Sequence, residues 1–325
     1  MVTEYTEEYV EKFGYRKYVG RKESRLKRIW SLARFELIST WHKSTTGKVI
    51  LIIVLVLNFM AITFGALALS TIIEEETNPN LRDETIQGVL HNLVGGYLTL
   101  GTQIFVSTET VSFGMEMGFL LIALIGIAGS GLFADDKQGK IVEIYLSKLE
   151  RSEYVAGKIA AIVGYINIFV TLPILGLGAL YVQALGENHL EYLGYYLGII
   201  FSGILVSVLL GQAILIFSVL VDKRAFASLG FYLTYLVGSI FGSIIRAQDS
   251  SNDFLLLISP STFLALLTFI CLGAFELDTW EGEVLLNNGE GLEYLHILGL
   301  AFVLIVIMSL FLLYKIRRMT TEELG

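Results

Sequence analysis

The sequence has few of the residues on which most enzyme and metal sites depend. One cysteine, Cys271, stands among 325 residues, and the four histidines lie far apart along the chain. A single cysteine excludes an intrachain disulfide and a zinc site built from several thiolates. The histidines lack the short spacing that metal ligands require. We therefore expect no catalytic residue, no metal and no bound cofactor in this chain.

Charge is scarce as well. Only 17% of the residues are charged, against about 25% in an average soluble protein. Hydrophobic residues make up 54% of the chain, and the mean hydropathy is +0.67. The formal net charge is −8, which is opposite in sign to that of a nucleic-acid-binding protein. The composition therefore excludes a nucleic-acid partner and indicates an all-α, polytopic protein in contact with the lipid bilayer.

Six apolar segments are long enough to cross a membrane, which requires about 20 residues. They are residues 49–73, 111–133, 159–182, 193–221, 225–245 and 294–314. Two further segments are ambiguous, because 86–106 contains several polar residues and 254–275 is interrupted by Pro260. We expect both to lie on the outer side as interfacial or re-entrant helices. Residues 254–275 then serve either as a hydrophobic cap or as a gate.

The basic residues predict the orientation, because Lys and Arg accumulate on the cytoplasmic side. With six spans and both termini inside, only Arg82 and Arg246 face outward. The outer segments, 74–110 and 246–293, are acidic. The sequence thus predicts a multi-pass protein of the cell membrane, with a charged cytoplasmic N-terminus (1–24), a six-span domain (49–314) and a cytoplasmic tail (315–325).

Residues 25–48 precede the first span and have the pattern of an amphipathic helix. The apolar positions that recur on one face are Leu26, Ile29, Trp30, Ala33, Leu37 and Trp41. Such a helix lies at the inner membrane surface, where it serves either as an anchor or as a lever for a cytosolic partner. Glu36 stands at the edge of the apolar face and is expected to be solvated or paired with an arginine.

Residues 135–158 form a second cytoplasmic segment that is longer than the 2 to 8 residues of an ordinary connector. Within it, Ile141, Ile144, Tyr145 and Leu149 are predicted to share one stripe of a short helix, and a second helix is predicted to start at Ser152–Glu153. A short amphipathic helix between two spans suits docking into a groove of a partner. The alternative is a charged loop without further function.

Several short motifs carry a resemblance to a known family. They are Asp136-Lys137-Gln138-Gly139-Lys140, Tyr145-Leu146-Ser147, Arg151 to Lys158, Arg34-Phe35-Glu36-Leu37 and Ser259-Pro260-Ser261. With the six-span layout, they make nearly the whole chain resemble the permease subunits of type-2 ABC transporters. The resemblance implies an exporter in which two permeases, identical or different, work with two copies of an ATPase subunit.

The same resemblance assigns roles to the two cytoplasmic segments. Residues 25–48 would be the connecting helix, with Arg34, Glu36 and Trp41. The ATPase-coupling residues would be Gly139, Lys140, Ile141, Glu143, Ile144, Tyr145, Lys148 and Leu149. ATP and Mg²⁺ would be bound by the partner ATPase, since the sequence lacks the G-x-x-x-x-G-K-[ST] phosphate-binding motif.

Polar residues inside the spans are candidates for a transport pathway: Asn58, Glu116, Asn167 and Gln212. The alternatives are hydrogen bonds between helices for the amides and an interfacial position for Glu116. Pro173 is predicted to kink the third span. The pairs Gly194/Gly198 and Gly238/Gly242 predict close helix contact, either within the chain or at a dimer interface.

Two other functions compete with export. The acidic outer segments would suit transmission of force to an extracytoplasmic protein by the same ABC architecture. An ion-coupled secondary transporter would need ionisable groups near the middle of the membrane, and five of the six predicted spans contain no charged residue.

Overall fold

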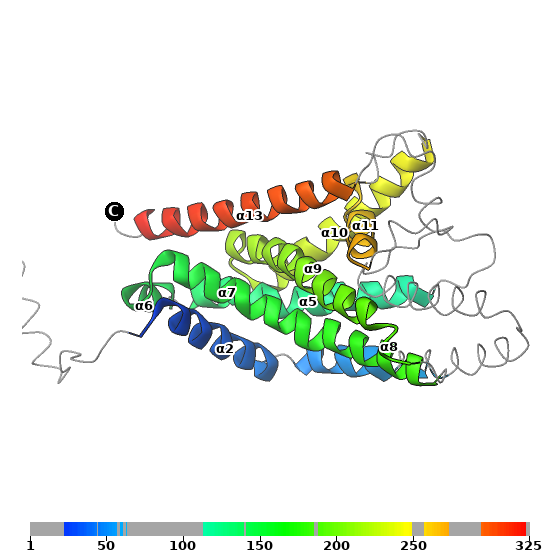
Figure 1. The fold of residues 1–325 in the computed structure, drawn as a ribbon. Coiled ribbons are helices and arrows are strands. Elements are labelled where there is room, and N and C mark those ends of the chain that lie inside the picture. The colour runs from blue at the N-terminus through cyan, green and yellow to red at the C-terminus, as the bar shows by residue number, and fades with distance from the viewer. Residues whose placement is uncertain are drawn as a thin grey trace, which may run out of the picture.

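The computed structural model describes residues 23–43, 45–56, 59–60, 63, 113–139, 141–184, 188–248, 257–272 and 294–322, and every regular element in these ranges is helical. Figure 1 shows an elongated bundle. Its helices are α2 (Arg25–Lys43), α5 (Phe113–Gln138), α6 (Val142–Lys148), α7 (Arg151–Ile166), the π-helical turn η1 (Asn167–Thr171), α8 (Leu172–Ala184), α9 (Leu193–Leu220), α10 (Arg224–Gln248), α11 (Pro260–Cys271) and α13 (Tyr294–Glu322).

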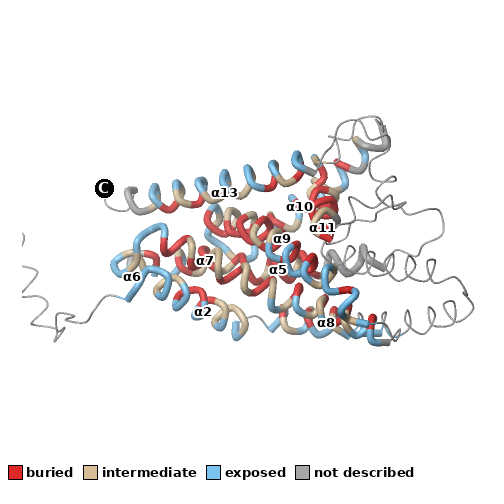
Figure 2. Tube along the Cα trace, in the orientation of Figure 1, coloured by how far each residue is buried: buried red, intermediate tan, exposed pale blue. Residues whose placement is uncertain are grey.

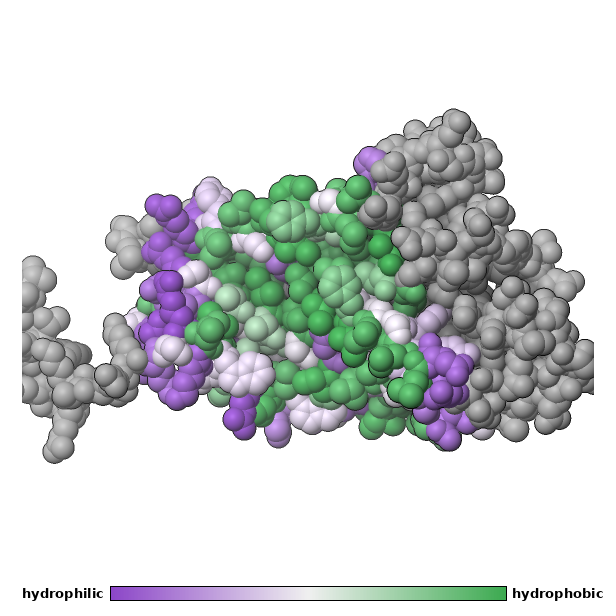
Figure 3. Space-filling view, in the orientation of Figure 1, coloured by the Kyte–Doolittle hydropathy of each residue, from purple (hydrophilic) through white to green (hydrophobic). Residues whose placement is uncertain are grey.

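Among the described residues, four helices are long and apolar enough to cross a membrane. They are Arg151–Leu180, Leu193–Leu220, Arg224–Gly242 and Leu295–Met319. They coincide with the last four predicted spans, and a hydrophobic band covers the bundle between more hydrophilic ends (Figure 3). Residues 113–133 of the second predicted span belong to α5, whereas the first span is described only in part, including the shorter apolar helix Thr45–Val56. The described helices therefore fit a multi-pass membrane protein, and the count of six spans stays a prediction.

Helix α9 lies at the centre of the bundle and packs against α5, α7, α10, α11 and α13. Figure 2 shows buried residues along much of this helix. Small residues permit this position: a Cβ atom built on Gly211 would lie 2.8 Å from Cγ2 of Ile162 in α7. Helix α13 lies at the edge, and its exposed apolar side chains face outward, as expected for a helix in contact with lipid.

Helix α11 has 12 residues and is roughly 18 Å long, which is shorter than the ~30 Å hydrocarbon core of a bilayer. Its N-terminus rests on α10, because a Cβ atom on Gly238 would lie 3.0 Å from Cγ of Pro260, and one on Gly242 would lie 2.7 Å from Cα of Ser259. Its C-terminus rests on Gly198 of α9. Three of the four glycines predicted to allow close contact thus do so within one chain, and a Cβ on Gly194 would meet no atom of the described residues within 4 Å.

The third predicted span is distorted close to its proline. Helices α7 and α8 are continuous through η1, in which the Leu172 amide donates to the Asn167 carbonyl five residues earlier. Pro173 lacks an amide hydrogen, and its ring crowds the carbonyl of Phe169 four residues before it. A π-helical turn is one way for a helix to accommodate such a break. The distortion expected at Pro173 is therefore present as a widened turn just before it.

Candidate functional site

A buried ionic cluster joins three helices at the end of the bundle that carries α6. The ammonium of Lys158, in α7, is fully buried and lies 2.7 Å from Oε1 of Glu36 in α2 and 2.6 Å from Oδ2 of Asp136 in α5. Both acids are 7% exposed. Buried charges are tolerated when they are paired and hydrogen-bonded. This cluster is called the Lys158 site below.

Two tyrosines complete the Lys158 site. The Tyr154 hydroxyl donates to Oδ2 of Asp136 at 2.6 Å, and the Tyr145 hydroxyl lies 3.5 Å from Oε1 of Glu36. The Lys158 ammonium also lies 5.4 Å from the centre of the Tyr154 ring and 5.5 Å from that of Tyr145, within range of cation–π attraction. Because Tyr145 belongs to α6, the Lys158 site connects this short helix to α2, α5 and α7.

The Lys158 site holds two carboxylates and one ammonium, so its net charge is −1 when both acids are ionised. Burial raises the pKa of the Glu36 carboxyl above its usual 4.5, although Lys158 acts in the opposite direction. Burial, together with the neighbouring acids, raises the pKa of Tyr145 to about 12, which keeps its hydroxyl protonated at neutral pH. Glu36 is therefore the group through which the site can take up a proton.

This arrangement predicts a pH dependence of stability. A carboxyl with a raised pKa in the folded protein stabilises the fold fully below its ordinary pKa, and this contribution is lost as the pH rises through the folded value. From pH 4.5 upward, the unfolding temperature of the wild type should therefore fall relative to that of Glu36→Gln. Thermal unfolding in detergent between about pH 4 and pH 8 tests this. Glu191→Gln, an exposed change, is the control, and parallel profiles for wild type and Glu36→Gln would contradict the prediction.

Close packing brings α2 against α7. A Cβ atom on Gly157 would lie 2.6 Å from Cδ2 of Leu32, so glycine is required for the observed distance between the two helices. Glu36 follows Leu32 by one helical turn and Lys158 follows Gly157 directly, so this contact places the acid beside the ammonium. The expectation that Glu36 is solvated or paired with an arginine is wrong, because its partner is a buried lysine.

A second ionic cluster fixes the start of α7. Glu150 is its N-cap residue and forms a capping box with Glu153, whose carboxylate accepts the Glu150 amide at 3.1 Å. Arg25 pairs with Glu150, and Arg28 pairs with Glu153, which is 2% exposed. The helix predicted to start at Ser152–Glu153 thus begins at Arg151. Both arginines belong to α2, so this cluster also holds α2 on α7.

Helix α6 presents two different faces. Val142 is buried, and Tyr145, Leu146 and Leu149 pack against the core. Ile144 is 59% exposed and Ile141 38%, although both are apolar. The predicted stripe that grouped these isoleucines with Tyr145 is therefore wrong: Tyr145 and Leu149 face the bundle, whereas the isoleucines face away from it.

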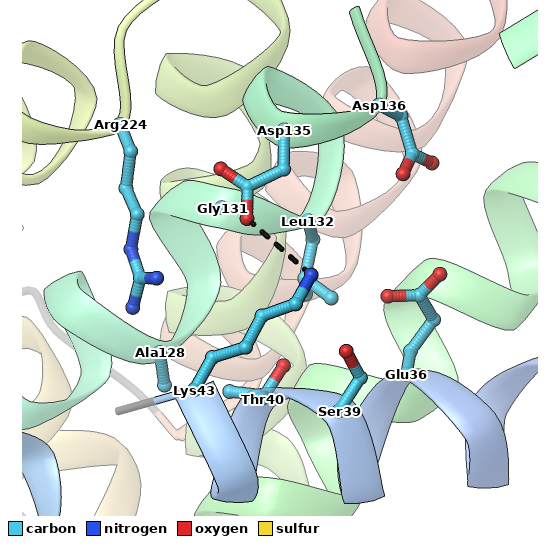
Figure 4. A pocket seen from close by; sticks show the side chains of 10 residues that line it. All are labelled: Glu36, Ser39, Thr40, Lys43, Ala128, Gly131, Leu132, Asp135, Asp136 and Arg224. Atoms are coloured by element: carbon cyan, nitrogen blue, oxygen red, sulfur yellow. Dashed lines mark ion pairs between the residues drawn. The ribbon is translucent and has the colours of Figure 1, made fainter. Parts of the chain in front are cut away.

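Figure 4 shows a small polar cavity beside the Lys158 site, between α2, α5 and α10. Its volume of about 20 Å³ is room for one water molecule. Lys43 approaches Asp135 to 3.8 Å across it, and Arg224 donates to the Ile127 carbonyl at 2.8 Å. On α5, Lys137 pairs with Asp222 at 2.9 Å, which lowers the pKa of that acid and ties α5 to the turn before α10.

Two of the predicted pathway residues, Asn167 and Gln212, have different hydrogen-bond partners. Asn167 donates to Oγ of Ser207 at 2.7 Å, and Gln212 donates to Oγ of Ser309 at 2.8 Å. Both amides thus bond between helices, the alternative role considered for them. The backbone of Glu116 belongs to α5. Asn58, Lys140 and the side chains of Glu116 and Glu143 lie outside the described residues.

The remaining predicted site residues lie along α2 and at the ends of α6. Arg34 is exposed, and Trp41 is partly buried and stacks on Phe169 of η1. Gly139 and Lys148 flank α6, and Lys148 is exposed. The sequence patterns indicate no separate role for Asp136, Tyr154 or Lys158. The available signal was a lysine directly before a charge-free apolar run, a position that requires a partner when buried.

No family model matches the chain, and no curated protein matches it. In the described part of the chain, no group of three or more His, Cys, Asp or Glu side chains could hold a metal ion.

Proposed function

We propose that this chain is the membrane-spanning permease subunit of an ABC exporter. In this proposal it crosses the cell membrane six times with both termini in the cytoplasm. Two permease copies, identical or different, work with two copies of a separate ATPase subunit. The observation that carries the proposal is the Lys158 site, because it joins a short surface helix, α6, to α2 and to two long helices of the bundle. A movement imposed on α6 would reach all of them.

The exposed face of α6 supports its assignment as the coupling helix. It presents Ile141 and Ile144 to solvent beside Lys148, an apolar surface with a charged edge. Such a surface on a short helix suits a groove in a partner protein. The orientation is supported by Figure 1, in which α2 begins and α13 ends at the end of the bundle that carries α6. Six crossings with both termini on one side would agree with that placement.

The docking assignment predicts that Ile144→Asp releases the ATPase while the permease stays folded. Its side chain is 59% exposed, so the change removes an apolar contact without disturbing the core. Affinity purification of the chain from its native membranes, with quantification of bound ATPase by mass spectrometry, measures the effect. We expect at least a tenfold loss, about what removal of one central anchor costs.

Leu190→Asp is the matched control, since Leu190 is 76% exposed and lies in the turn between α8 and α9. It should retain the ATPase at the wild-type level. Equal retention by wild type and Ile144→Asp would contradict the docking assignment, and absence of any ATPase from the wild-type preparation would contradict the ABC proposal.

A proton-coupled secondary transporter is the second candidate, and the buried net charge of the Lys158 site favours it. Sites of that kind usually lie near the middle of the membrane, whereas the Lys158 site lies at one end of the bundle, next to α6. Transport by the purified chain alone in vesicles, driven by a pH gradient and abolished by Glu36→Gln, would favour this candidate over the ABC proposal.

A further inference from the structure

The π-helical turn η1 interrupts the regular backbone hydrogen bonding of the third span. The regular pattern of bonds four residues apart gives way there to the bond from the Leu172 amide to the Asn167 carbonyl. Pro173 supplies no amide, and its ring disfavours a regular turn around Phe169. Turns of this type are frequent at functional sites and are one of the known causes of sharp helix kinks.

The same turn contains a buried polar group without a bond. Thr171 is 4% exposed, and its Oγ1 has no hydrogen-bond partner among the described residues. Gly203 of α9 makes room for this side chain, because a Cβ atom on Gly203 would lie 2.9 Å from Cβ of Thr171. In a regular helix, a threonine hydroxyl can bond the carbonyl four residues earlier. A second conformation of η1 would thus supply a bond that the present one lacks.

An aromatic contact from α2 stabilises the present conformation of η1 against this second conformation. The ring of Trp41 stacks on the ring of Phe169 with 4.6 Å between centroids and 5° between planes. Tyr165 packs on the same Phe169 ring at 4.7 Å, and the Lys48 ammonium lies 5.2 Å from the Trp41 ring centre. The residue that α2 contacts is therefore the one whose carbonyl the Pro173 ring would crowd in a regular α-helix.

We propose that Asn167–Thr171 is a hinge of the third span, and that Trp41 is the positioning residue through which α2 holds it in the π-helical conformation. The inference deepens the proposed function and rests on it in one respect, that α2 moves when the ATPase moves. Displacement of α2 separates Trp41 from Phe169, η1 changes its hydrogen bonding, and α8 reorients relative to α7. The Asn167–Ser207 bond, 2.7 Å long, is one contact with α9 that must break or shift.

The hinge is tested first on the chain alone in lipid nanodiscs, by hydrogen exchange of the backbone amides in residues 163–172. Trp41→Leu should accelerate exchange there by roughly fivefold to tenfold, because the stack no longer stabilises the turn. Trp41→Phe should restore slow exchange. Trp30→Leu is the matched control on the same helix, since Trp30 is 69% exposed, and it should leave exchange unchanged.

Phe169→Leu removes the stack from the other side and should reproduce the effect of Trp41→Leu, which keeps the test valid if one variant does not fold. Equal exchange in Trp41→Leu, Phe169→Leu and Trp30→Leu would overturn the hinge. The exchange rates of the isolated chain do not depend on whether an ATPase binds it.

The role of α2 is tested in the complex with the copurified ATPase. In the wild type, exchange at residues 163–172 should differ between ADP and ATP. Trp41→Leu should keep ATP hydrolysis and lose this difference, and Trp41→Phe should recover it. A nucleotide effect that survives in Trp41→Leu would overturn the role of Trp41. A wild-type chain that binds no ATPase would overturn the proposed function, but it would not affect the result of the hydrogen-exchange test on the isolated chain.

Discussion

Lys158→Met is expected to destabilise the protein by about 3–5 kcal/mol, the usual cost of removing one partner from a buried ion pair. The ammonium lies within 2.7 Å of two carboxylates that are almost inaccessible to solvent. Methionine leaves Glu36 and Asp136 facing each other without a counter-charge, so one of them must become protonated or α2 must leave α7. Thermal unfolding in detergent, followed by the fluorescence of the three tryptophans, measures the loss.

Two variants make this result specific to the charge. Lys223→Met removes an exposed lysine at the same end of the bundle and should cost less than about 0.5 kcal/mol. The triple change Glu36→Gln, Asp136→Asn, Lys158→Met removes every charge of the Lys158 site and should recover most of the stability, since buried ion pairs often add little net stability over neutral groups. A Lys158→Met protein as stable as Lys223→Met would show that the ammonium is not buried between α2, α5 and α7.

Removal of one acid should have a smaller effect than removal of the lysine. Glu36→Gln changes the net charge of the Lys158 site from −1 to 0 and keeps the Lys158–Asp136 pair intact. The three charged groups of the site come one each from α2, α5 and α7.

The long helices were predictable because a segment that crosses the bilayer has few alternatives to a helix. A charge-free run of about 20 residues must hide its backbone amides in a helix, and α9 and α13 follow their predicted segments within a few residues at their N-termini. The helix α2 was predictable from its period, and the distortion of the third span from Pro173. These features are local, because residues close in the sequence determine each of them.

The Lys158 site was not predictable in the same way, because its charges come from distant parts of the sequence. Glu36 and Lys158 are 122 residues apart, and the pattern around Glu36 indicated only the edge of an apolar face. Helix α6 shows a different limit. With seven residues it has about two turns. The prediction placed Ile141 and Ile144 on the face of Tyr145 and Leu149, where the structure instead has Val142 and Leu146.

Gly242→Ala is expected to detach α11 from α10. The added methyl group would lie 2.7 Å from Cα and 2.9 Å from the backbone nitrogen of Ser259, the N-cap residue of α11. Backbone atoms cannot rotate away as the end of a side chain can, so the whole N-terminus of α11 must shift. Overpacking of this kind costs about 1–3 kcal/mol.

The single cysteine of the chain reports this shift without any engineered label. Cys271 is the last residue of α11 and is partly buried, and its carbonyl lies close to Gly198 of α9. We expect a maleimide to label Cys271 faster in Gly242→Ala than in the wild type, together with a lower unfolding temperature. Gly194→Ala is the matched control, since no described atom lies within 4 Å of its built Cβ, and the change should be neutral or should stabilise α9 by up to about 1 kcal/mol. Equal labelling in the two variants would mean that α11 does not rest on Gly242.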